Sequence, residues 1–221
     1  MSSIVIAGDT SGSVTLQAPA VAGSSVLSLP AVTDTVAGIA ATQTLTNKSI
    51  VATQLTGTIA AARLPAGTVL QVVHAKIVSQ TSTSSTTYAD TGLTATITPS
   101  SASNKILVIV SQYLTVTGGT SAGYGYQTNI GVKLLRNSTD LIVPANDSGG
   151  KYSLGMSTGI APATGIIVSW GNASFNYLDS PATTSATTYK TQFAKGLAGM
   201  GTMYTNDNGG GSFITLMEIA A

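Results

Sequence analysis

The sequence predicts an all-β protein, with an extended N-terminal region followed by an antiparallel β-sandwich. At least seven short β-rich runs lie in the second half, separated by Gly-, Asn- and Ser-rich turn signals. No part of that half shows the 3.6-residue periodicity of an amphipathic helix. The first part is built mainly from Ser, Thr, Ala, Gly and Val, and it carries too few large apolar residues on one face to form its own core.

Residues 1–38 form the first predicted region, a series of short β segments broken by Gly and Pro. Two similar phrases recur in it, VTLQAPAVAG at 14–23 and VLSLPAVTDT at 26–35. A segment of this kind becomes ordered only by packing on something else, most simply on copies of itself. The pattern therefore favours a self-assembling structural protein over an enzyme.

Residues 39–68 read as a connector or shaft. Ile50, Leu55, Ile59 and Leu64 are spaced four or five residues apart, which suits a narrow apolar seam between parallel chains. A flexible linker explains the same composition, and the sequence leaves both readings open.

Residues 69–221 carry the longer strands of the predicted sandwich head. The run LTATITP alternates, so Leu93, Ala95 and Ile97 are expected to face inward. The continuous apolar run at 106–110 predicts a central strand buried on both faces. Further strands are expected at 69–78, 130–134, 173–178, 187–194 and 213–220.

Charged residues make up only 8% of the 221 residues, against about 25% in typical soluble proteins. Low charge leaves little repulsion between neighbouring subunits, which suits dense assembly. A net charge of +1 gives no electrostatic footprint for nucleic acid. The chain has no cysteine, no secretion signal and no apolar run long enough to span a membrane, so we expect synthesis in the cytoplasm without membrane insertion.

The residue types that carry chemistry are few and scattered. The single histidine, His74, lies in a predicted strand without a nucleophile or carboxylate indicated beside it, so we expect it to be satisfied by neighbours or to lie at a subunit contact. The Asp and Glu residues show no catalytic spacing, although carboxylates can still meet in space. The tract 206–209 fails the calcium-loop pattern and predicts a turn. We therefore expect no catalytic residue, no metal and no cofactor.

The aromatic residues divide between predicted strands and predicted loops. Tyr113, Phe175, Tyr177, Tyr189 and Phe193 fall in strands and are assigned to the core. The loop set is Tyr124, Tyr126, Tyr152, Trp170 and Tyr204. Exposed Tyr side chains can stack on sugars or anchor a protein interface. Tyr124, Tyr126, Tyr152 and Tyr204 are the candidate receptor contacts, in loop tracts 118–128, 145–153 and 202–212.

Several phrases resemble known proteins. TLQAPAVAGSSVLSLPA, QTLTNKSI and LTGTIAAARLPAGTVLQVV are similar to the N-terminal half of tailed-bacteriophage fibre and appendage proteins. TTYADTGLTATITPSSASNKILVIVSQ, VKLLRNSTDLI and FNYLDSPATTSATTYKTQ resemble a module that forms compact trimeric jelly rolls of the C1q/tumour-necrosis-factor type.

The resemblance implies a homotrimeric virion protein. Its N-terminal region would anchor it to other virion proteins, and its head would contact a host-surface glycan or protein. A tail fibre is the expected role, and a capsid decoration protein or head fibre is the alternative. Neither composition nor spacing separates the two.

Overall fold

The computed structural model describes most of the chain from residue 59 onward and short pieces before it. The described residues are 3–7, 10–17, 49, 51, 57, 59–119, 130–144, 146–147, 150–151, 168–196 and 200–221. Internal contacts divide the chain into two units, Met1–Gly57 and Thr58–Ala221.

The first unit contains an antiparallel hairpin of β1 (Ser3–Ala7) and β2 (Ser13–Gln17). Gly12, which precedes β2, has φ +76°, a conformation that glycine adopts without strain. Ile4, Val5 and Ile6 are exposed by 65%, 61% and 55%. Because these neighbours point to alternate faces, the hairpin shows apolar side chains on both faces. A two-stranded hairpin of this kind is marginal by itself in water, so it needs a surface to pack on.

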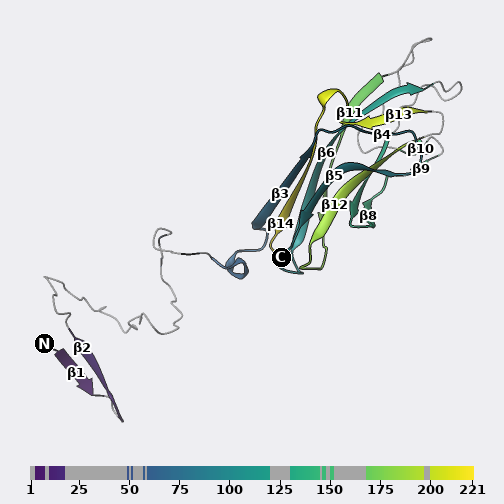
Figure 1. Ribbon diagram of the computed structural model, residues 1–221. Coiled ribbons are helices and arrows are strands. Elements are labelled where there is room, and N and C mark those ends of the chain that lie inside the picture. Colours follow the sequence, from purple (N-terminus) through teal and green to yellow (C-terminus); the bar gives the residue numbers. More distant parts are fainter. Residues whose placement is uncertain are drawn as a thin grey trace. The chain divides into compact units, whose positions relative to one another are not determined.

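The second unit is a sandwich of two antiparallel sheets (Figure 1). The first sheet is built around the long strand β6, with β11 on one side and other strands on the opposite side. Along that opposite side, β14 pairs with the first half of β6 and β13 with the second half. The strands of this sheet are β3 (Val69–Ile77), β4 (Thr81–Thr83), β6 (Lys105–Gly119), β11 (Val168–Asp179), β13 (Met200–Thr205) and β14 (Ser212–Ile219).

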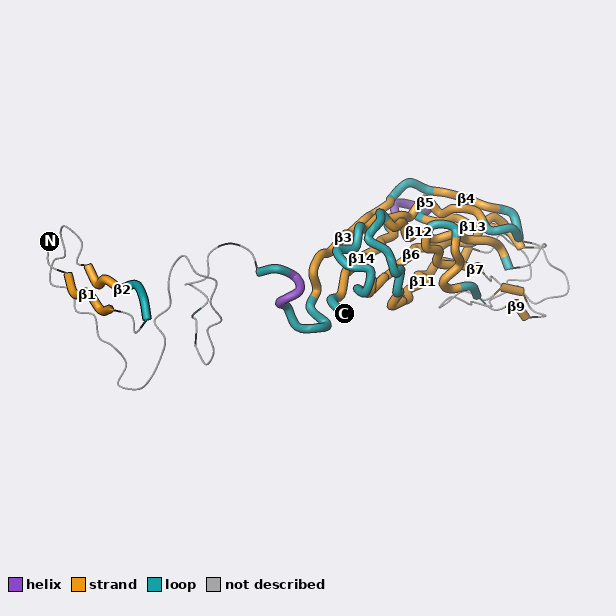
Figure 2. The backbone as a smooth tube through the Cα atoms, turned by 90° about the horizontal axis from the view of Figure 1, so that it is seen from below, coloured by secondary structure: helices purple, strands orange, loops and turns teal. Residues whose placement is uncertain are grey.

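The second sheet has the order β5-β12-β7-β8, and strands dominate the described part of the unit (Figure 2). Its strands are β5 (Ala89–Ile97), β7 (Ile130–Arg136), β8 (Thr139–Ile142) and β12 (Thr187–Lys195). The remaining elements are the pair β9 (Asn146–Asp147) and β10 (Gly150–Lys151) and the 3-10 turns η2 (Ala61–Arg63) and η3 (Asp207–Gly209). The chain crosses between the sheets repeatedly, as in a jelly roll. The predicted all-β class and antiparallel sandwich are confirmed.

The core between the sheets follows the expected alternation. Leu93, Ala95 and Ile97 of β5 are exposed by 1%, 6% and 1%, while the threonines between them face solvent. Tyr189 and Phe193 of β12 are fully buried, as predicted. These inward side chains hold the two sheets together by removing apolar surface from water.

A buried polar layer lies between two parts of this core. The side-chain oxygen of Gln112 accepts a hydrogen bond from Thr191 Oγ1 at 2.6 Å, so the link crosses from one sheet to the other. The Gln112 amide nitrogen donates to Thr205 Oγ1 at 2.7 Å. All three residues are fully buried. Because each side chain has a partner, the layer can be buried without the cost of unpaired polar groups.

The prediction that 106–110 is buried on both faces is wrong. Ile106, Val108 and Val110 are 0–1% exposed, but Ile109 is 40% exposed and Leu107 is partly exposed. The reason is that the second sheet covers only one face of β6. The sequence pattern cannot distinguish burial inside a sandwich from an apolar outer face, since both place apolar residues at every position.

Tyr113 also departs from its predicted place in the core. Tyr113 is four residues along β6 from Ile109, so both side chains lie on the outer face. There Tyr113 is half-buried. Its ring lies over Gly210, so closely that a Cβ at Gly210 would come within 2.3 Å of Tyr113 Cδ1. Glycine is therefore required there to let the turn after β13 pass under the ring.

Candidate binding surfaces

The predicted receptor tyrosines lie in different places. Tyr124, Tyr126 and Tyr152 are outside the described residues. Tyr204 is described, but it lies in strand β13 and is partly buried, so its assignment to a loop is wrong. Trp170, also assigned to a loop, lies in β11 and is 57% exposed. Both segments became strands because β6 is long enough to pair with them beyond the part covered by β14.

Tyr204 and Trp170 share one row across the first sheet. In the strand register, both lie opposite Thr115 of β6, one on each side. The Thr115 hydroxyl is buried and has no hydrogen-bond partner among the described residues. That these two aromatic residues lie in one row of the first sheet could not be predicted from the sequence alone.

The tract 202–212 is partly strand and partly a tightly held turn. Asn206 and Asn208 have positive φ values of 59° and 50°, which Asn tolerates better than most residues. The Asn206 side chain donates to Ser79 O at 3.1 Å and accepts from Ser212 Oγ at 2.6 Å. Asp207 Oδ1 accepts from Gln80 Nε2 at 2.5 Å. These side chains hold the turn.

The first sheet presents an apolar outer face, which we define by Val72, Leu107, Ile109, Leu178, Phe213 and Met217. Four of these residues form one row across four paired strands: Val72, Met217, Leu107 and Leu178. Val72 is 55% exposed and Leu178 is 52% exposed. A contiguous apolar patch on a sheet face is typical of an interaction surface.

His74 and Lys76 lie beside this apolar outer face, on β3. His74 Nδ1 is 2.9 Å from Thr215 Oγ1, and the imidazole stacks on Phe213 with ring centroids 5.9 Å apart. Lys76 Nζ lies 5.7 Å from the centre of the same ring. His74 therefore has neighbours that satisfy it, and these neighbours are a hydroxyl and an aromatic ring.

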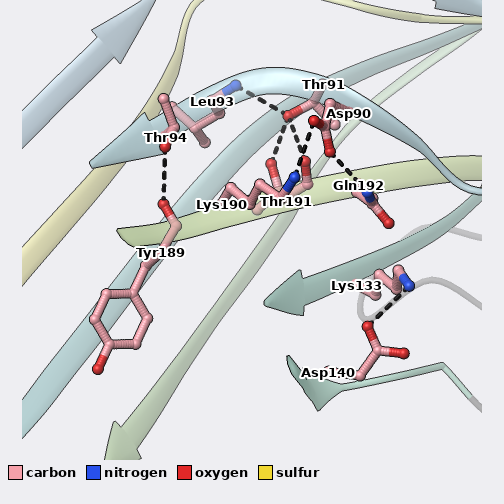
Figure 3. A network of polar contacts seen from close by, with 10 residues as sticks. All are labelled: Asp90, Thr91, Leu93, Thr94, Lys133, Asp140, Tyr189, Lys190, Thr191 and Gln192. Atoms are coloured by element: carbon pink, nitrogen blue, oxygen red, sulfur yellow. Dashed lines mark hydrogen bonds and ion pairs between the residues drawn. The ribbon is translucent and has the colours of Figure 1, made fainter. Parts of the chain in front are cut away.

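The outer face of the second sheet is polar and contains a depression at a β-bulge (Figure 3). Lys190 of β12 lies opposite Thr94 of β5, but Gln192 lies opposite Asp90. Residues 91–93 therefore face a single residue, Thr191. Bulges of this kind re-aim side chains and occur next to functional sites.

Backbone freedom and buried hydrogen bonds hold the bulge in shape. Gly92 has φ +84°, and the neighbouring side chains of Thr91 and Leu93 both point into the protein. Thr91 Oγ1 lies 2.6 Å from Thr191 Oγ1 and accepts from the Leu93 backbone N–H at 3.1 Å. The depression has a volume of about 180 Å³ and is lined by Asp90, Gly92, Leu93, Thr94, Lys190 and Thr191.

Asp90 is the acidic group of this depression. Its Oδ2 is 3.0 Å from Lys190 Nζ, and its Oδ1 accepts from Gln192 Nε2 at 2.7 Å. Burial alone would raise the pKa of Asp90, but the hydrogen bonds from Gln192 and Lys190 and the charges of Lys190 and Lys133 together lower it. Asp90 therefore remains a carboxylate, an acceptor, at neutral pH.

A second ion pair lies beside the depression on the same face. Lys133 Nζ of β7 is 2.8 Å from Asp140 Oδ1 of β8. Lys133 also lies over the ring of Tyr88, 4.9 Å from its centre. Among the described residues of this face, the charges of these two lysines and two aspartates balance.

Two other carboxylates are buried and serve the fold. Glu218 of β14 is fully buried and accepts hydrogen bonds from Gln71, Ser100 and Asn104.

Asp179 of β11 is 4% exposed. It accepts from Arg136 Nη1 at 2.8 and 2.9 Å and from the Tyr189 hydroxyl at 2.6 Å, which joins the two sheets. Burial and the Asp179 hydrogen bond raise the pKa of Tyr189 far above its ordinary range.

Within the described residues, no three or more acidic and histidine side chains gather as a metal-binding group. In the same part of the chain, no helix is long and apolar enough to cross a membrane.

The bulge depression was not anticipated from the sequence. Its one sequence signal is the triplet Asp90-Thr91-Gly92, because Asp and Gly are turn residues set inside an otherwise alternating strand. Lys190 and Gln192 gave no signal, since they alternate as ordinary outward residues of β12.

Comparison with known proteins finds no matching family model and no matching curated protein. Among solved structures, a T=1 particle derived from infectious bursal virus is similar, with 15% identity and a TM-score of 0.30 over 69% of this chain and 37% of that chain. The VP2 subviral particle of infectious bursal disease virus is similar at 14% identity, with a TM-score of 0.27 over 69% of this chain and 38% of that chain. The chain thus spans little more than a third of those chains. Its function has to be argued from its own residues.

Proposed function

We propose that this chain is a structural protein of a tailed-bacteriophage virion, a homotrimeric fibre whose sandwich head contributes to attachment at the host surface. The observation that carries the proposal is the apolar outer face of the first sheet. A row of four apolar residues crosses that face. Ile109, in the next row, is 40% exposed, and Phe213, one row further along β14, is 37% exposed.

Self-association through this face follows from its chemistry. Burying the apolar side chains would contribute about 25 cal/mol for each Å² removed from water. Lys76 lies four residues along β3 from Val72, with His74 between them, so a partner can cover the row without burying the lysine ammonium. With only 8% charged residues in the chain, copies repel one another little. In the proposed trimer this face points toward the three-fold axis, so it is covered in every copy.

The N-terminal hairpin supports the proposed anchoring role. Its apolar residues Ile4, Val5 and Ile6 are exposed on both faces, and a surface on another virion protein, or on copies of the same hairpin, would cover them. The head would then be left to contact a host glycan or protein. We propose binding, and no catalysis, as the activity of the head.

Immunogold electron microscopy of intact virions, with copy number from quantitative mass spectrometry, tests the proposal. A tail fibre predicts label at the tail and a few to a few dozen copies. Label over the capsid and hundreds of copies would make the chain a decoration protein or head fibre. Absence of the chain from purified virions would refute both.

Attachment is tested separately with the double variant Tyr124→Ala/Tyr126→Ala. We expect the variant to assemble normally and to reduce adsorption of virions to cells, because the segment predicted from the sequence as a loop combines small polar residues with Tyr, a composition that suits adaptable contacts. Tyr204→Ala is the comparison within β13. Unchanged adsorption in an assembled double variant would exclude those two tyrosines as the contact.

A further inference from the structure

The structure assigns a second recognition site to the head. We propose that the depression at the β5 bulge binds one ring of a neutral saccharide. This inference deepens the proposed attachment role, but saccharide binding by the purified chain is measured independently of virion location, assembly and adsorption.

The first argument is the size of the depression. Its volume of about 180 Å³ is slightly larger than the cavity of about 150 Å³ that accepts a benzene ring. Pockets for drug-sized ligands are larger, about 300–1,000 Å³. The depression therefore fits one six-membered ring, and the rest of a longer glycan would extend over the open face.

The second argument is the set of polar groups at the rim. Asp90 has two acceptor oxygens and uses one on Lys190 and one on Gln192, which leaves further lone pairs on both. The Lys190 ammonium has three donors and spends one on Asp90. Gln192 lies outside the lining but is bonded to Asp90, and its carbonyl oxygen has no partner among the described residues. Adjacent hydroxyls of a sugar each donate and accept, which matches this alternation of spare acceptors and donors.

The third argument is charge. Asp90 balances Lys190, and the neighbouring Asp140 balances Lys133. An anionic or cationic ligand would have to compete with these ion pairs and leave one member of a pair unbalanced. A neutral polyol forms hydrogen bonds to both members of the Asp90–Lys190 pair and disturbs neither charge.

The fourth argument is preorganisation. Asp90 and Lys190 already hold each other, and the backbone under them is fixed by the buried Thr91–Thr191 contact at 2.6 Å. Thr191 in turn donates to Gln112 in the core at 2.6 Å. Little side-chain freedom remains to be lost on binding, so the entropy cost is low and even a small ligand can bind.

Saturation-transfer difference NMR tests this site with the full-length protein. The probes are neutral monosaccharides, namely glucose, galactose, mannose and N-acetylglucosamine, with glucuronate as the charged comparison. We expect transfer to at least one neutral sugar, with a dissociation constant on the order of 1 mM. Transfer to none of them, or to glucuronate alone, would overturn the proposal.

Variants then locate the binding. Asp90→Ala and, independently, Lys190→Ala are expected to weaken it about 10-fold or more, the loss of a hydrogen bond to a charged group. Asp140→Ala is the matched control, since it removes an aspartate paired with a lysine on the same face but outside the depression. Asp90→Asn is a further variant, which keeps the shape of the side chain and removes its charge. Far-UV circular dichroism checks that each variant is folded. Equal binding by Asp90→Ala and the wild type, or equal losses in Asp90→Ala and Asp140→Ala, would refute the site.

Discussion

Glu218 provides the sharpest test of how this fold is held together. It is a fully buried carboxylate on the last strand. Its Oε1 accepts from the Ser100 backbone N–H at 2.7 Å, from Ser100 Oγ at 2.7 Å and from Asn104 Nδ2 at 2.6 Å, and its Oε2 accepts from Gln71 Nε2 at 2.5 Å. One side chain thus joins β14, β3 and the turn before β6.

The perturbation is Glu218→Gln, compared with Glu218→Ala. The glutamine can keep its oxygen toward Ser100 and Asn104, but its amide then meets the Gln71 amide, which already donates to Thr98 O at 2.8 Å. The charge-assisted bonds also become neutral ones, so we expect a loss of about 2 kcal/mol in the free energy of unfolding. The alanine variant leaves buried donors without acceptors, and we expect a loss of about 4 kcal/mol.

The same carboxylate predicts a pH dependence. Burial alone would raise the pKa of Glu218, but the hydrogen bonds from Asn104, Gln71 and Ser100 lower it below its ordinary 4.5. The unfolded chain therefore binds the proton first as the pH falls. The stabilisation by Glu218 is fully present above about pH 5.5 and is lost as the pH falls through the folded pKa.

Urea unfolding followed by circular dichroism, at one fixed protein concentration, measures both effects. The difference between wild type and Glu218→Gln should be constant at neutral pH and shrink below pH 4.5. Asp140→Asn, an exposed member of a surface ion pair, is the control and should change stability by no more than about 1 kcal/mol. A Glu218→Gln protein as stable as the wild type at pH 7, or a difference that does not change down to pH 3, would refute the reasoning.

Three further predictions concern the core and the unit boundary. Val108→Asp should abolish the folded head, because an unpaired charge in the core costs several kcal/mol, whereas Ile109→Asp should keep the far-UV spectrum; the reverse result would contradict the assignment of faces. Arg136→Ala should lower the free energy of unfolding by about 3 kcal/mol, since it leaves Asp179 buried without its cation, and a loss under 1 kcal/mol would argue against the pair. The fragment 58–221 should fold alone with protected amides, and an unfolded fragment would show that the head depends on the N-terminal unit.

Much of the head could be predicted from the sequence because strand alternation is a local signal. Leu93, Ala95 and Ile97 alternate with threonines, and β5 buries that face. The outer face of β6 could not be predicted in the same way. Ile109 and Val108 are equally apolar, and only the position of the second sheet decides which of them is buried.

The candidate sites were harder to predict because they depend on partners far apart in the chain. Asp90 meets Lys190 and Gln192 across 100 and 102 residues, through a bulge that the hydrophobic pattern does not encode. Tyr204 was singled out as a loop residue, since nothing local indicated that β6 would extend far enough to pair with its segment. The Asp179–Arg136–Tyr189 contact likewise exists only once the two sheets meet.

The measurement that tests the central claim most directly is the mass of the purified full-length chain by light scattering, at micromolar concentration, for the wild type and for Ile109→Asp. The proposed trimer, in which copies meet through the apolar outer face, predicts three times the chain mass of 22.1 kDa for the wild type, and the mass of a folded monomer for the variant. A wild type of 22.1 kDa, or a variant that stays trimeric, would contradict the account.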